Sequence, residues 1–67
     1  MLSAERLNEI VHNVEKAERE FTEHWDLNGE GREYHLRTSA LDANANRQAR
    51  IALIELINEL KSDLTTN

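Results

Sequence analysis

Residues 49–64 read ARIALIELINELKSDL and hold a larger share of bulky aliphatic side chains than any other window of the chain. Successive residues of a helix lie about 100° apart around its axis, so six apolar residues of this stretch fall within about one third of the circumference. They are Ala49, Leu53, Leu56, Ile57, Leu60 and Leu64. The stretch therefore predicts an amphipathic helix whose apolar stripe faces a neighbouring helix.

Ile54 lies at the edge of that stripe, and Ile51 lies nearly opposite it. One packed helix covers a stripe a little over 100° wide, and an aliphatic side chain left in water forgoes about 1.5–3 kcal/mol of burial. We therefore expect Ile51 and Ile54 to contact a second copy of the chain or another protein. The alternative is that they are isolated surface isoleucines, which are common in soluble proteins.

The N-terminal part of the chain predicts a helix from about residue 3 to residue 25. Ser3 is a suitable N-cap, and Glu5 places a negative charge in the first turn, where the helix dipole favours it. Apolar residues follow at heptad spacing, as in a coiled coil. They are Leu7, Ile10, Val11, Val14, Ala17, Phe21 and Trp25.

The middle of the chain predicts a loop over about residues 26–38. Asn28, Gly29 and Gly31 tolerate a positive φ angle, and the following residues show no apolar period. Tyr34 and Leu36 are expected to anchor this loop beside Trp25.

A second helix is predicted over about residues 39–64. Ser39 and Asp42 form a loose capping box, with Thr38 as an alternative N-cap. Small residues such as Ala45 in its first half would admit Phe21 and Trp25 from the first helix, which favours an antiparallel hairpin.

These features predict an all-α fold in which residues 1–67 form a single helical-hairpin domain. A chain of this size buries only about 60 % of its unfolded surface, and it has no cysteine for disulfide bonds. Oligomerisation is the remaining source of stability. We therefore expect a homodimer, in which two hairpins form a four-helix bundle.

One cluster within the two helices is polar. Glu18 interrupts the apolar stripe of the first helix, and an antiparallel hairpin would bring it level with Asn46 and towards Arg50. These three residues are predicted to form a polar layer in the core, which would fix register or oligomeric state. The alternative is that their long side chains reach solvent at the edge of a thin hairpin.

No motif in the sequence indicates catalysis, and a two-helix hairpin lacks a concave site that excludes water. We therefore expect neither an enzyme nor a cofactor. Glu20, His24 and His35 are the nearest approach to a zinc site, but a single i,i+4 pair is expected by chance in so acidic a chain, and we predict no metal.

Composition also indicates the subcellular location of the protein. The first residues lack the apolar core of a signal peptide, and the acidic helix faces have the wrong sign for anionic lipids. The expected location is the cytoplasm, without membrane contact.

The net charge of −5 works against non-specific binding to nucleic acids. Four arginines nevertheless lie towards the loop side of the predicted hairpin, and they define an alternative function as a nucleic-acid-binding hairpin dimer. They are Arg32, Arg37, Arg47 and Arg50.

The function that the sequence favours is that of a small regulatory protein. It would bind a target protein and act as an inhibitor, adaptor or anti-activator by covering a surface of that target. The expected contacts with a second copy or with the target are Ile51, Ile54, Trp25 and Tyr34. A third alternative is a structural oligomerisation module.

Overall fold

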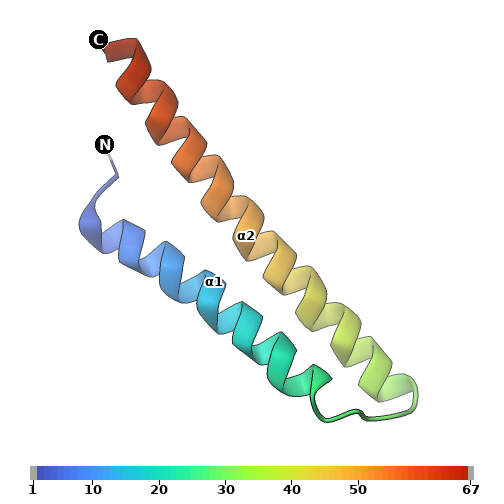
Figure 1. Ribbon diagram of the computed structural model, residues 1–67. Helices are drawn as coiled ribbons and strands as arrows, with labels where there is room; N and C mark the ends of the chain where they lie inside the picture. The colour runs from blue at the N-terminus through green and yellow to red at the C-terminus, as the bar shows by residue number, and fades with distance from the viewer. Residues whose placement is uncertain (1, 67) are drawn as a thin grey trace.

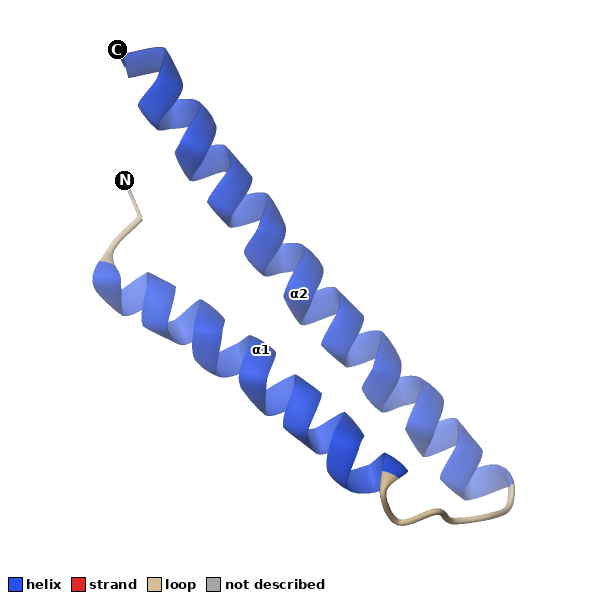
Figure 2. Cartoon of the chain, in the orientation of Figure 1, coloured by secondary structure: helices blue, strands red, loops and turns tan. Residues whose placement is uncertain are grey.

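A computed structural model describes residues 2–66 and shows two helices packed side by side in opposite directions. Helix α1 spans Ala4–Trp25 and helix α2 spans Arg32–Thr66. A short loop over residues 26–31 joins them, and the described part of the chain contains no strand (Figure 2). The predicted all-α hairpin is confirmed.

Local interactions set the two ends of α1. Ser3 is its N-cap, with an extended backbone, and the Ser3 Oγ accepts a hydrogen bond of 3.0 Å from the Arg6 amide. At the other end the amides of Leu27 and Asn28 bond to carbonyls of the last turn. Asn28 then takes a φ of 50°, so it is one of the residues that turns the chain away from the helix.

Helix α2 begins at Arg32, well before the N-cap predicted at Thr38 or Ser39. Gly31 has a φ of 97°, and its carbonyl accepts a hydrogen bond of 3.1 Å from the His35 amide in the first turn. Tyr34 and Thr38 both form hydrogen bonds with His24 of α1, and Thr38 also bonds to the Tyr34 carbonyl one turn earlier. The segment predicted as the end of the loop is therefore helical, because it is part of the contact between the helices.

The contact between α1 and α2 follows a strict heptad alternation of three and four residues, which we name the hairpin seam. Every residue of the seam is buried or half-buried. Its members are Arg6, Ile10, Asn13, Ala17, Glu20 and His24 on α1, and Tyr34, Thr38, Leu41, Ala45, Gln48, Ala52, Glu55 and Glu59 on α2. Alanines and polar side chains dominate this list, so the two helices meet through small and polar groups.

The aliphatic stripe predicted to face α1 does not do so. Leu53 is 58 % exposed and Leu60 is 62 % exposed. Contacts at both ends of the hairpin fix how α2 is rotated about its own axis, and this rotation leaves the two leucines exposed. Tyr34 and Thr38 meet His24 at the loop end, and Glu55 pairs with Arg6 at the open end. Since all of these α2 residues share one helix face, that face turns towards α1 and the leucines turn away.

The isolated hairpin is long and exposes much surface. Its Cα radius of gyration is 15.8 Å, compared with about 11 Å for a compact domain of this length. The accessible area is 5515 Å², whereas a typical folded monomer of this mass exposes about 4,400 Å². Only Ile10, Ala17, Leu41, Ala45 and Ala52 are buried among the described residues. The C-terminal turns of α2 also extend past the start of α1 (Figure 1).

Candidate functional site

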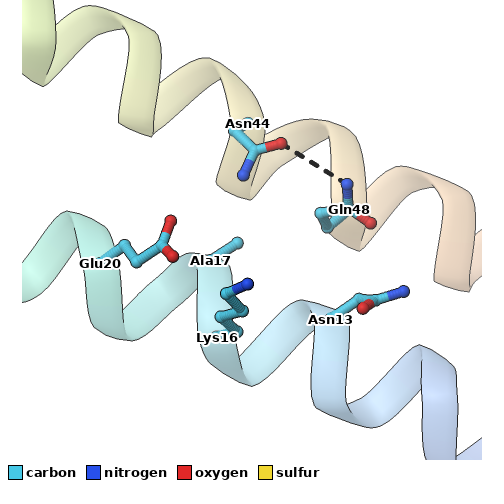
Figure 3. Close-up of a pocket in the computed structure, with 6 residues that line it drawn as sticks. All are labelled: Asn13, Lys16, Ala17, Glu20, Asn44 and Gln48. Carbon is cyan, nitrogen blue, oxygen red and sulfur yellow. Dashed lines mark hydrogen bonds between the residues drawn. The ribbon is translucent and has the colours of Figure 1, made fainter.

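One side of the hairpin seam is polar and hollowed. A cavity of about 220 Å³ lies there, and side chains from both helices line it (Figure 3). Its lining residues are Asn13, Lys16, Ala17, Glu20, Asn44 and Gln48. The Gln48 Nε2 donates a hydrogen bond of 3.5 Å to the Asn44 Oδ1 within it. This side therefore presents amides and charges.

A second cavity of about 170 Å³ continues the first, because both are lined by Asn13 and Gln48. Ile10, Ala52 and Ile51 supply its apolar lining, and Arg6 completes it. Ile51 is 37 % exposed. We name this side of the hairpin the groove side, and Ile51 is its exposed aliphatic residue.

The positions of these cavities show where the remaining aliphatic side chains point. Ile51 and Leu53 lie on either side of the buried Ala52, each about 100° away around the helix. Because Ile51 is on the groove side, Leu53 is on the opposite side. On α1, Lys16 and Glu18 lie in the same way on either side of Ala17. The side opposite the groove therefore receives residues from both helices.

That opposite side carries a continuous set of bulky apolar side chains, which we name the apolar face. It consists of Leu7, Val11, Val14, Phe21 and Trp25 on α1, and Leu53, Leu56, Ile57, Leu60 and Leu64 on α2. Phe21 and Trp25 stack with ring centroids 6.0 Å apart, yet Trp25 remains 57 % exposed. Exposed apolar patches of this extent mark interaction surfaces in soluble proteins.

The four predicted contact residues lie on different sides of the hairpin. Trp25 is on the apolar face and Ile51 is on the groove side. Ile54, 52 % exposed, lies a further 100° around α2 from Leu53 and points away from α1. Tyr34 is half-buried in the hairpin seam. The single chain therefore does not join these four residues into one surface.

The predicted polar layer does not form inside the hairpin, because Glu18, Asn46 and Arg50 are all exposed. Other polar residues occupy the seam. The Arg6 Nε donates a hydrogen bond of 3.0 Å to the Glu55 Oε2, and the Arg6 Nη2 donates a second bond of 2.5 Å to the Glu55 Oε1. The bond to Glu55 raises the pKa of Arg6, so Arg6 keeps its positive charge throughout the neutral range.

At the loop end, Tyr34 joins the end of α1 to the start of α2. Its hydroxyl donates to the carbonyls of His24 and Trp25, at 3.0 and 3.1 Å, and so caps the last turn of α1. The rings of Tyr34 and His24 stack 4.3 Å apart. A Cβ on Gly29 would overlap the Tyr34 ring, so the loop has room for glycine only at this position.

His24 contacts Tyr34 and Thr38, whereas the sequence had suggested Glu20 and His35 as its neighbours. Its Nε2 lies 3.0 Å from the Thr38 Oγ1 and 3.1 Å from the Tyr34 carbonyl. The Thr38 hydroxyl donates its own proton to that carbonyl, so the hydrogen must be on the His24 Nε2. Among the described residues, no group of three histidine, aspartate or glutamate side chains is arranged to hold a metal ion.

The arginines considered for nucleic-acid binding do not form one patch. All four are exposed, but Arg32 and Arg50 are 18 residues apart on α2, or about 27 Å. Arg37 is seven residues before Asn44 and lies on the groove side, whereas Arg32 and Arg50 do not. The positive charge is therefore spread along and around the helix.

The fold and these surfaces define a two-helix hairpin with one polar and one apolar side. No protein-family model, curated protein or solved structure matches the chain. Neither described helix combines the length and the apolar character needed to cross a membrane.

Proposed function

We propose that this chain is a non-enzymatic protein-binding module that pairs with a second copy of itself through the apolar face. Pairing gives a four-helix bundle whose core consists of the leucines of α2 and the aliphatic and aromatic residues of α1. The bundle then acts as an inhibitor, adaptor or anti-activator by covering a surface of a target protein. The apolar face is the observation that carries this proposal.

The exposed area supports pairing quantitatively. The hairpin exposes 5515 Å², which is about 1,100 Å² more than expected for a folded monomer of its mass. A stable dimer of standard size buries about 800 Å² on each partner. The surplus is therefore large enough to supply an interface. The hairpin seam is too narrow and too polar to supply an equivalent core within one chain.

Target binding is assigned to the surfaces that pairing leaves free. Ile51 on the groove side and Ile54 on the outward side of α2 both lie off the apolar face. A helix commonly recognises another protein by laying apolar side chains into a hydrophobic groove of that protein. The groove side adds the amides of Asn13 and Gln48 as hydrogen-bonding groups for a target.

Two adjacent substitutions test the pairing. Leu53→Glu places a carboxylate on the apolar face, whereas Ile54→Glu places the same group about 100° away. Light scattering at micromolar concentration should show a dimer for the wild type and for Ile54→Glu, and a monomer for Leu53→Glu. A wild-type monomer, or equal behaviour of the two variants, would contradict pairing through this face.

The target-binding role is tested separately in the source cells. The tagged wild-type chain should co-purify with one partner protein in stoichiometric amount, identified by mass spectrometry. Ile51→Glu should lose that partner while it remains dimeric. Retention of the partner by Ile51→Glu and by Ile54→Glu would show that neither isoleucine is the contact.

A further inference from the structure

The apolar face runs diagonally across the hairpin. On α1 it extends along the whole helix, from Leu7 at the open end to Trp25 at the loop end. On α2 it is confined to the C-terminal half, from Leu53 to Leu64. Most of the corresponding positions in the loop half of α2 hold polar or small side chains, such as His35, Asp42 and Asn46, and Leu36 is the bulky aliphatic residue among them. The two ends of the face therefore differ in which helix supplies the apolar groups.

Each end of the face lacks a partner within its own chain. At the loop end, Trp25 is 57 % exposed, and Leu36, which is about level with it on α2, is itself 58 % exposed. At the open end, Arg6 lies level with Glu55, so α1 begins at about the level of residue 57 and the last turns of α2 pass beyond it. Leu64 is 77 % exposed there. Aromatic residues are thus uncovered at one end and leucines at the other.

We infer that the second copy lies antiparallel to the first, with the two loops at opposite ends of the bundle. Phe21 and Trp25 of each copy then pack on Leu60 and Leu64 of the other. This inference rests on the proposed pairing through the apolar face and specifies its geometry. A two-fold axis produces the same contact twice, so both uncovered ends are filled at once.

Charge supports the antiparallel arrangement over the parallel one. Glu18 is the carboxylate on the α1 part of the apolar face, and it lies about level with residue 43 of α2, as the Arg6–Glu55 pair shows. With both loops at the same end, α1 would stack on α2 of the other copy, and Glu18 would face the other copy's Asp42. Two facing carboxylates repel each other. Reversing one copy moves them apart.

The composition of the chain allows a direct test, because it has one tryptophan and no cysteine. In the variant Leu64→Cys, a nitroxide label on the new thiol quenches a tryptophan only at close range. Within one chain, Trp25 is about level with residue 36, so the label at 64 is about 42 Å away along the helix axis. Quenching of Trp25 by this label can therefore come only from the other copy.

The antiparallel arrangement predicts that labelled Leu64→Cys loses most of its Trp25 emission at concentrations where light scattering shows a dimer. Dilution into the monomer range should restore the emission. A label in Leu60→Cys should also quench, and it provides a second variant if the first pairs poorly. Leu36→Cys is the positive control, because residue 36 is close to Trp25 within one chain and should quench at any concentration.

The opposite result is equally distinct. A dimer in which Trp25 stays bright, and in which unlabelled Leu64→Cys rapidly forms a 64–64 disulfide, would show that the copies are parallel and would overturn the inference. Pairing itself would stand in that case. A chain that is monomeric in the absence of any substitution would overturn the proposed pairing and this arrangement together.

Discussion

The hairpin seam and the apolar face use the same two helices in opposite ways. The seam contains alanines, amides, an ion pair and the Tyr34–His24 contact. The face contains most of the bulky aliphatic and aromatic side chains, and all of them except the half-buried Val14 and Phe21 are exposed in the single chain. Small and polar groups contribute direction and register, whereas burial of large apolar groups contributes most of the folding free energy. The seam therefore sets how the helices align, and the face supplies the stability when it is covered.

The largest expected effect comes from two neighbouring aliphatic residues that look alike in the single chain. Leu53 is 58 % exposed and Ile54 is 52 % exposed. Leu53 lies on the apolar face, and Ile54 lies about 100° further around α2, on its outward side. Leu53→Ala should lower the free energy of unfolding of the dimer by about 2–4 kcal/mol, as for a buried leucine. Ile54→Ala should change it by less than about 0.5 kcal/mol.

Denaturant unfolding followed by circular dichroism at one fixed protein concentration measures both variants. A difference between them is expected only if a second copy buries Leu53. Equal and small effects would indicate that both residues remain in water. Burial of the apolar face would then not be the source of the dimer's stability.

A smaller effect is expected from the loop, where the seam begins. Gly29→Ala introduces a Cβ that overlaps the Tyr34 ring, so the ring must move away from the end of α1. We expect a loss of about 1–3 kcal/mol, as for overpacking. Glu30→Ala, in the same loop, is the matched control and should be nearly neutral. Thermal unfolding of the two variants provides the comparison.

Removal of the Tyr34 hydroxyl alone should cost less. Tyr34→Phe keeps the ring stacked on His24 but loses the hydrogen bonds to the carbonyls of His24 and Trp25. A loss of about 1 kcal/mol in the free energy of unfolding is expected. Hydrogen exchange should increase at the amides in the last turn of α1 and stay unchanged near Ser3. Uniform exchange along α1 would argue against a capping role.

The smallest effect is expected at the open end of the seam. Arg6→Gln removes the ion pair with Glu55, which is solvent-accessible and screened by salt. The melting temperature of Arg6→Gln should fall by less than that of Tyr34→Phe. The difference in melting temperature between Arg6→Gln and the wild type should shrink in 1 M salt. Because the pKa of Arg6 is raised on folding, its contribution is present across the neutral range and is lost only in strong alkali. A difference that grows with added salt would contradict an electrostatic role.

The sequence predicted α1 well because its signals were local. Ser3 is a strong N-cap, and Asn28 and Gly31 provided the positive φ angles that the turn uses. The start of α2 was placed too late because an apolar period was sought, whereas the seam there consists of Tyr34 and Thr38. Their spacing of four residues, followed by steps of three and four to Leu41 and Ala45, was the available signal.

The choice of the packed face of α2 could not be predicted from hydrophobicity. The aliphatic stripe of residues 49–64 was predicted to pack against α1 because it is the most apolar side of α2. In the structure, Ala52 and Glu55 contact α1 instead. The decision depends on tertiary pairs, Arg6 with Glu55 and His24 with Tyr34, which are 49 and 10 residues apart in the chain. A residue-by-residue reading of one helix contains no information about such pairs.

The mass of the unmodified chain in solution tests most directly whether the apolar face is the core of a dimer. Sedimentation equilibrium at micromolar concentration should give twice the chain mass of 7.8 kDa, with full helical circular dichroism. On dilution, the mass and the helix signal should fall together, because the hairpin seam alone supplies little stability. A chain that sediments at 7.8 kDa and keeps its helices at every concentration would contradict the account.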